Sequence, residues 1–148
     1  ISIVVDQRPL QNDNLSGFIS SDRPTVSAIY LDKGGSKQNA VGLSNADPDT
    51  NIYIYFSEAM DNTSITANTS GTSCTGTMRV SPDNFSNCIR MSADDPLVSP
   101  DNKIFTFDPN NLLDGTVYLI RVTTGVKDGS GNNMSSDNVT GTSFTIRK

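Results

Sequence analysis

Short runs in which apolar and polar residues alternate recur from residue 24 to the end of the chain, with turn residues between them. The clearest run is 51–57, where Ile52, Ile54 and Phe56 share one face and two tyrosines share the other. Alternation with a period of two is typical of a strand with one buried face. Similar runs predict further strands at 25–31, 74–80, 88–91, 103–107, 116–123 and 142–147.

The segments between these runs read as turns and loops. Residues 60–68 are too short and too poor in helix formers for more than one helical turn. Residues 32–50 form a long polar loop that contains Gly34 and Gly35, and residues 81–84 (Ser-Pro-Asp-Asn) are a turn signal. Seven short strands joined by such turns predict an all-β fold, an antiparallel β-sandwich.

The composition supports this fold class and excludes several partners. The 148 residues are 34% hydrophobic and 18% charged, with 19 Ser, 15 Thr and 15 Asn. Asn, Ser and Thr divert backbone hydrogen bonds into turns and caps, so an α-helical protein is excluded. The length suits one domain with a core. A net charge of −5 argues against nucleic acid or an anionic membrane surface as a partner.

The chain lacks the residues that most enzymes of this size would use. It has no His, the commonest general base and metal ligand, and no Gly-x-Ser-x-Gly elbow or phosphate-binding glycine loop. Glu58 is the only Glu, and its motif contains no basic partner or second acid at a fixed spacing. We therefore expect no catalytic residues and no enzymatic activity.

The ends of the chain and its two cysteines indicate the compartment. The sequence starts at Ile1 without a charged and apolar leader, and its longest apolar stretch is residues 117–120, so we expect a mature or excised piece with no membrane span. In an oxidising compartment Cys74 and Cys88 would form a disulfide that stabilises by about 3 kcal/mol. Two buried free thiols are the alternative. We expect an extracellular or cell-surface location.

Calcium is the one cofactor that the acidic residues suggest. Asp47, Asp49 and Asn51 have the spacing of a calcium loop, but Ile52 stands where that loop needs Gly, which excludes an EF-hand. Calcium at a loop end is a weaker hypothesis, and ordinary turn formation is the alternative. The candidate ligands are Asp47, Asp49, Asp128 and Asp137.

Asn-x-Ser/Thr triplets are the candidate sites of glycosylation. The chain has six, against about three to four expected by chance from its composition, so the excess is only suggestive. They begin at Asn14, Asn62, Asn68, Asn84, Asn133 and Asn138.

An ordered set of motifs in residues 24–147 resembles a known family. Residues 51–61 (NIYIYFSEAMD) resemble a strand signature ending in F-S-E-x-M-D, and residues 113–118 (LDGTVY) resemble the G-T-x-Y end of an L-x-x-G-T-x-Y strand entry. Residues 126–134 (VKDGSGNNM) resemble a V-x-D-x-x-G-N-x-M loop. In this order the motifs are similar to the bacterial Ig-like domain of S-layer proteins of the SbsA type (Big_5).

The resemblance implies an Ig-like sandwich over residues 23–148 and structural roles for two prominent side chains. Glu58 is implied to cap the junction after its strand by accepting backbone N–H groups. Tyr118 is implied to form a tyrosine corner, with its hydroxyl bonded to the preceding loop. The segment between Cys74 and Cys88 is longer than the family pattern. Residues 1–22 have no counterpart in that pattern.

Residues 1–22 read as an arm that bears one strand. Ile1, Ile3 and Val5 would face one way and Val4 the other, which suits strand addition to a sheet edge. The arm could equally be the tail of a preceding domain or a further strand on this one. We therefore expect a structural module of a surface assembly whose partner is itself or an adjacent domain. Two versions remain open: an adhesin-type bead whose loops bind a ligand, and a self-assembling fibre subunit.

Overall fold

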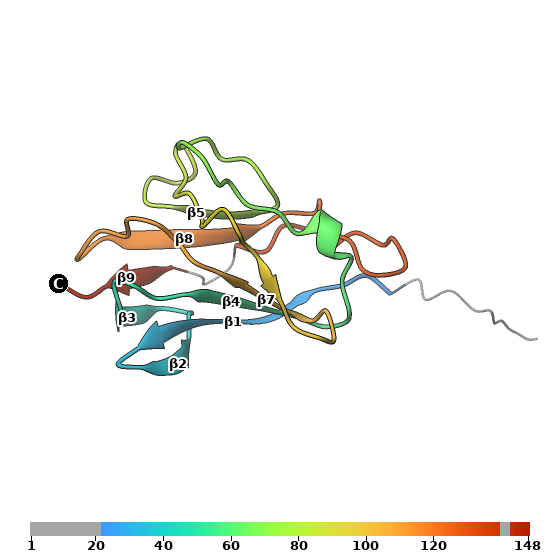
Figure 1. Cartoon of the computed structure of the whole chain (residues 1–148), viewed down its shortest axis with the longest axis horizontal. Helices are drawn as coiled ribbons and strands as arrows, with labels where there is room; N and C mark the ends of the chain where they lie inside the picture. Colours follow the sequence, from blue (N-terminus) through green and yellow to red (C-terminus); the bar gives the residue numbers. More distant parts are fainter. Residues whose placement is uncertain (1–21, 140–142) are drawn as a thin grey trace, which may run out of the picture.

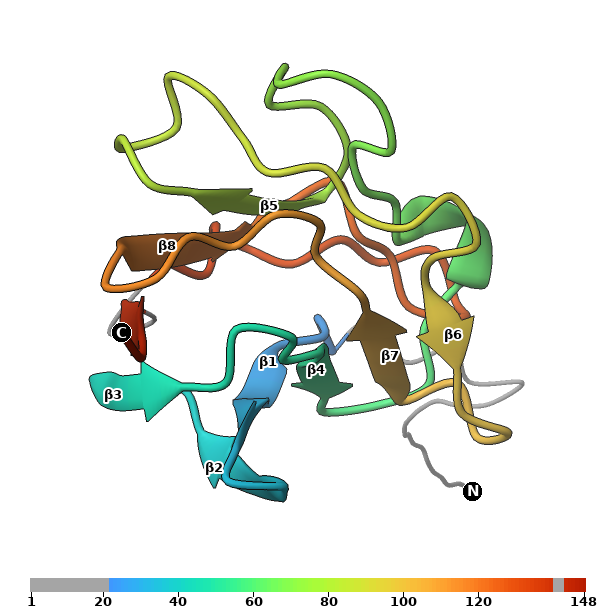
Figure 2. The ribbon, with the colours of Figure 1, turned by 60° about the vertical axis from the view of Figure 1, so that its left-hand side comes forward.

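The computed structural model describes residues 22–139 and 143–148, so nearly all of the predicted arm lies outside the described residues. The described part contains nine strands and one 3₁₀ turn, η1 (Asn62–Ser64), arranged as two sheets that face each other (Figure 1, Figure 2). No helix in this part is long and apolar enough to cross a bilayer. The fold is the predicted all-β sandwich.

Five strands form the first sheet and four form the second. The first has the order β2-β1-β4-β7-β6 and consists of β1 (Val26–Lys33), β2 (Ser36–Asn39), β4 (Ile52–Phe56), β6 (Leu97–Val98) and β7 (Ile104–Phe107). The second has the order β3-β9-β8-β5 and consists of β3 (Leu43–Ala46), β5 (Met78–Ser81), β8 (Val117–Val122) and β9 (Phe144–Ile146). β3 runs parallel to β9, and the other strand pairs are antiparallel.

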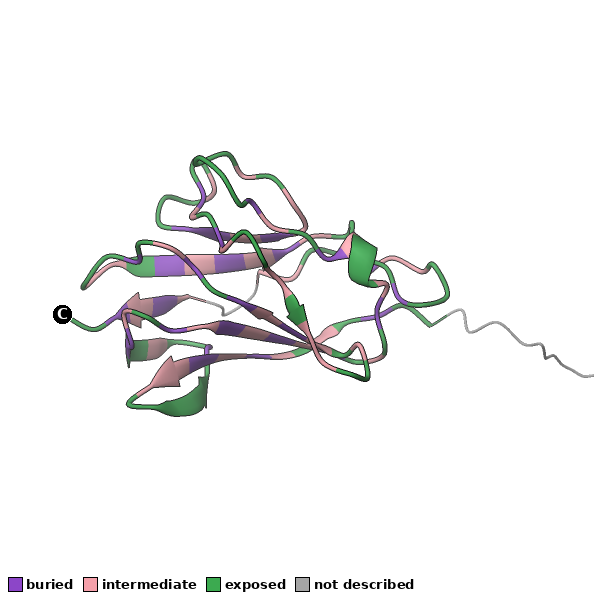
Figure 3. Cartoon of the chain, viewed as in Figure 1, coloured by how far each residue is buried: buried purple, intermediate pink, exposed green. Residues whose placement is uncertain are grey.

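The core lies between the sheets and follows the alternation seen in the sequence. The three inward residues of β4 are buried, and its two tyrosines on the outer face are half-buried (Figure 3). Phe56 meets Phe105 of β7 edge to face, with ring centroids 5.6 Å apart. In the second sheet the rings of Tyr118 and Phe144 stack at 5.7 Å. Aromatic pairs of this kind stabilise a core beyond the area that they bury.

The segment around the cysteines differs from the prediction. Residues 88–91 form no strand, and the strand predicted at 74–80 begins only at Met78. The reason is that loops satisfy this backbone: Cys88 N donates to Thr72 O at 2.8 Å, and Met91 N donates to Asn68 O at 2.7 Å. Residues 74–77 and 88–91, which were expected to be in strands, therefore belong to loops that backbone hydrogen bonds hold in place.

Three short strands, β2, β3 and β6, have no counterpart in the prediction. β2 consists of four exposed polar residues and β6 of only two residues, so neither shows apolar alternation. The sequence feature from which β2 could have been predicted is the Gly34-Gly35 pair. Both glycines have positive φ, 60° and 82°, which a two-residue hairpin turn favours at both central positions.

The described chain enters and leaves the sandwich at opposite ends of its long axis (Figure 1). Arg23 holds the entry by donating from Nη1 to the carbonyl of Asn133 at 3.1 Å. Arg147 holds the exit: its backbone N–H donates to Ala46 O at 2.9 Å, and its Nη1 donates to Asp47 Oδ1 at 2.7 Å. Both ends are thus fixed to loops of the domain.

Candidate functional site

A disulfide closes the segment between Cys74 and Cys88. Cys74 and Cys88 are bonded, with their Cα atoms 4.9 Å apart. The disulfide expected from the sequence is therefore present, and the alternative of two free thiols is wrong. Because the bridge ties the loop before β5 to the loop after it, it restricts the shape of the surface between them.

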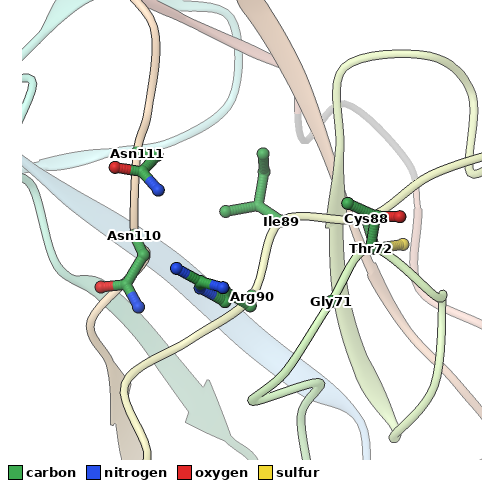
Figure 4. Close-up of a pocket in the computed structure, with 7 residues that line it drawn as sticks. All are labelled: Gly71, Thr72, Cys88, Ile89, Arg90, Asn110 and Asn111. Atoms are coloured by element: carbon green, nitrogen blue, oxygen red, sulfur yellow. The ribbon is translucent and has the colours of Figure 1, made fainter.

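Beside this bridge lies a hollow of about 220 Å³ that three loop segments build (Figure 4). Its wall residues are Gly71, Thr72, Cys88, Ile89, Arg90, Asn110 and Asn111. Figure 4 shows the Arg90 side chain reaching toward Asn110, with Ile89 between the Asn111 side and the Cys88 side. The hollow thus combines an apolar floor with polar groups on one side.

The backbone of the hollow is cross-linked segment to segment. Cys88 N donates to Thr72 O at 2.8 Å, and Asn110 N donates to Arg90 O at 3.0 Å. Asn111 has a positive φ of 60°, a conformation that Asn tolerates better than most residues. These bonds and the disulfide give the site a preformed shape. Sequence reasoning identified the disulfide but missed the hollow, because its residues come from loops far apart in the chain.

Glu58 lies elsewhere, and among residues 22–139 and 143–148 no backbone N–H donates to it, so the capping role expected of it is not seen in this part of the chain. Its carboxyl group shares a hydrogen bond with the side chain of Asp128, which is 1% exposed. Asp128 accepts the backbone N–H groups instead, from Ser130 and Asn132 at 2.9 Å each. Its carboxylate therefore shapes the loop that the sequence assigned to the family motif.

The pKa values of Glu58 and Asp128 are shifted in opposite directions because their surroundings differ. Burial, and then the nearby charge and hydrogen bond of Asp128, raise the pKa of Glu58. Burial also acts to raise the pKa of Asp128, but hydrogen bonds from Asn132 and Ser130 outweigh it and lower the pKa. The two neighbouring carboxyl groups therefore have pKa values shifted in opposite directions, upward for Glu58 and downward for Asp128.

The four candidate calcium ligands are not gathered into one site. Asp47 accepts from Gly34 N and Gly35 N at 2.9 and 3.3 Å, as well as from Arg147. Asp137 accepts from Thr124 N at 2.9 Å, and Asp49 is exposed. Residues 22–139 and 143–148 contain no group of three or more acidic, His or Cys side chains placed to hold a metal ion. Calcium binding stays a prediction.

Tyr118 makes the contact that defines a tyrosine corner. Its hydroxyl accepts a hydrogen bond from Leu113 N at 2.8 Å, while its ring is fully buried. Tyr118 thereby anchors the loop before β8 to the core, as the sequence predicts.

The candidate glycosylation sites differ in access. Asn62 and Asn84 have exposed side chains, whereas Asn68 is 6% exposed and donates to Gly71 O at 3.1 Å. Asn133 donates to Thr124 O at 2.7 Å, and Asn138 is half-buried. Asn14 and the assembly-strand residues Ile1, Ile3, Val4 and Val5 lie outside the described residues.

Comparison with known proteins identifies the family. A family model described as a bacterial Ig-like domain matches residues 23–146. The chain belongs to the bacterial Ig-like domain family. The hollow beside the disulfide is thus a feature of the loops on this bacterial Ig-like domain. No curated protein matches the chain.

Solved structures with the same fold include parts of the S-layer protein SbsC. A structure of that protein covers 85% of this chain at 18% identity with a TM-score of 0.51. A structure of its N-terminal part covers 86% of this chain at 17% identity with a TM-score of 0.52. A structure of its domains 1–6 also covers 86% of this chain, at 18% identity with a TM-score of 0.52. This chain spans only 14% to 24% of those chains. The likeness therefore concerns the fold of one bacterial Ig-like domain.

Proposed function

We propose that this chain is a non-catalytic structural module of a multidomain cell-surface protein, placed in line between neighbouring segments. The observation that carries the proposal is the path of the chain, which enters one end of the sandwich and leaves at the other (Figure 1). The disulfide suits an extracellular location. The fold is shared with domains of an S-layer protein, which is itself a surface protein.

The direction of the strands supports a role under tension. β1 follows the entry and β9 precedes the exit, and both run along the long axis (Figure 1). A pull on the two ends therefore loads the ladders of β1 with β4 and of β9 with β8 and β3 in shear. In shear several hydrogen bonds must break together, whereas in peeling they break one at a time.

The edges of the two sheets favour the bead over the fibre subunit. β2 presents four exposed polar residues, including Lys37. β6 consists of only two residues, with Pro96 directly before it and Pro100 two positions after it. The uncovered first half of β1 carries a register shift between Val26 and Ala28. Charged, very short and bulged edges are the devices by which proteins prevent strand addition.

The remaining two edges support the same reading. The outer side of β5 is covered, because Met78 N donates to Thr66 O at 2.9 Å and Ile89 N donates to Val80 O at 2.8 Å. In β3 the register shifts between Leu43 and Ala46, and Asn45 has a positive φ of 59°. The edges at β1 and β3 are thus irregular, that at β5 is covered, and those at β2 and β6 are short.

Sedimentation velocity and electron microscopy of the intact chain test the proposal. We expect monodisperse single particles, both for the intact chain and for a variant that lacks residues 1–21. Regular fibres that disappear in the truncated variant, and in Ile3→Asp within the intact chain, would contradict the bead and favour the fibre subunit. Ser2→Asp is the matched control, since Ser2 falls on the opposite face of the predicted strand.

A further inference from the structure

The hollow beside the disulfide contains polar groups that the fold does not use. Among the described residues, Arg23 and Arg79 donate to backbone carbonyls, Arg121 stacks on the ring of Phe85, and Arg147 pairs with Asp47. Arg90 has no such partner for its guanidinium within residues 22–139 and 143–148. A guanidinium beside a concave surface is a ready partner for a carboxylate, which it binds with two parallel hydrogen bonds.

The two neighbouring amides are also available. Asn110 and Asn111 bond through their side chains to no group in the described part of the chain, and both border the hollow. Each amide can donate two hydrogen bonds and accept through its oxygen. Next to Arg90 they are suited to the N–H and C=O of one peptide unit.

The apolar side of the hollow and its volume limit further which ligands can fit. The half-buried side chain of Ile89 and the residue Cys88 form the floor (Figure 4). The volume of about 220 Å³ lies below the roughly 300 Å³ at which pockets for larger ligands begin. The hollow therefore accommodates one small residue. Because no aromatic ring of the described residues borders the hollow, stacking of a sugar ring is disfavoured relative to binding of an aliphatic group.

We infer that this hollow binds the carboxyl-terminal residue of a peptide that ends in a small aliphatic side chain. Arg90 would pair with the terminal carboxylate, Asn110 and Asn111 with the last peptide unit, and Ile89 with the side chain. The cross-linked backbone keeps these groups in place before the ligand arrives, which lowers the entropy that binding costs. The inference goes beyond the structural role, which does not depend on it.

The test is an NMR titration of the isotope-labelled intact chain with acetyl-Ala-Ala and with the same peptide ending in an amide. We expect saturable shifts at Gly71, Asn110 and Asn111 for the free acid. The acid should bind at least about 10-fold more tightly than the amide, because the charged hydrogen bonds to Arg90 are lost in the amide.

Variants assign the effect to the hollow. Arg90→Gln should weaken binding of the acid at least about 10-fold, and Asn111→Gly should weaken it less while keeping the positive φ that this position requires. Lys103→Gln, which removes an exposed charge directly before β7 and outside the hollow, should leave binding unchanged. Each variant is first compared with the parent by its thermal unfolding curve.

The outcomes decide the inference in both directions. An absence of saturable shifts at millimolar peptide, equal binding of acid and amide, or unchanged binding by Arg90→Gln would overturn it. Peptides built from L-alanine and from D-alanine separate two sources of the ligand, a protein C-terminus and the end of a cell-wall peptide. Selective binding of either form supports the inference. The hydrodynamic test of the structural role uses no peptide, so the two proposals fail independently.

Discussion

Arg147 and Asp47 join the last residues of the domain to its first hairpin, with Nη1 and Oδ1 2.7 Å apart across 100 positions of sequence. The same carboxylate accepts the backbone N–H groups of Gly34 and Gly35 at the turn between β1 and β2. One aspartate thus holds both a hairpin turn and the exit of the chain. Because Asp47 has three hydrogen-bond partners, its substitution should lower the free energy of unfolding more than substitution of Arg147.

We expect Asp47→Asn to lower the free energy of unfolding by about 1–2 kcal/mol, since hydrogen bonds to a charged acceptor are lost or weakened. Arg147→Gln should cost less than about 1 kcal/mol, because the Arg147 side chain is 51% exposed. Denaturant unfolding of both variants measures the difference. A larger loss for Arg147→Gln than for Asp47→Asn would contradict the assigned roles.

The opposite pKa shifts of Glu58 and Asp128 predict a pH dependence of stability. The pKa of Glu58 is raised, so the stability from its protonated form is present at low pH and is lost as the pH rises through that raised pKa. The pKa of Asp128 is lowered, so its contribution is present above the ordinary Asp pKa and is lost as the pH falls through the lowered value.

Glu58→Gln isolates the first of these two effects. The Gln side chain donates to Asp128 at every pH, so the variant should be more stable than the parent at pH above the Glu58 pKa, by about 1 kcal/mol. It should also lose the fall in stability that the parent shows toward neutral pH. Denaturant midpoints across the acid-to-neutral range give the answer, with Asp49→Asn as a control at an exposed carboxylate. A Glu58→Gln profile parallel to that of the parent would contradict the raised pKa of Glu58.

The tyrosine corner predicts the effect of removing one hydroxyl group. Tyr118→Phe leaves Leu113 N without its acceptor and should lower the free energy of unfolding by about 1 kcal/mol. Tyr55→Phe is the matched control, since the Tyr55 ring lies against Tyr30 on the outer face and its hydroxyl bonds to no described residue. Equal costs for both variants would mean that the hydroxyl of Tyr118 contributes nothing specific.

The sequence predicted those parts of the fold in which side-chain pattern and burial coincide. Ile52, Ile54 and Phe56 alternate because one face of β4 is buried, and the strand was predicted within one residue at each end. β2 escaped prediction because its residues stay exposed and its pairing depends on a glycine turn. The role of Glu58 was also missed, since its partner Asp128 lies seventy positions away and no local pattern joins them.

The hollow was beyond prediction for a similar reason. Arg90 and Asn110 become neighbours through a backbone hydrogen bond between two loops, and the tie from Thr72 to Cys88 adds a third segment. Of the features that build the hollow, the sequence indicated the cysteine pair, because a disulfide can be expected from two cysteines without knowledge of the fold. Loop surfaces of this kind depend on tertiary geometry, where local propensity carries little information.

Pulling on a tandem array of this chain by its two ends measures whether the domain resists force in line. We expect one rupture per copy, at a force higher than when the same domain is pulled from Ser36 in β2 and the C-terminus, a geometry that peels the hairpin. Reduction should increase the contour length released on unfolding by about 45 Å. The disulfide spans 14 positions, an extended residue reaches about 3.6 Å, and the bridged Cα atoms already lie 4.9 Å apart. Rupture at equal or lower force in the end-to-end geometry would contradict a module built to transmit tension.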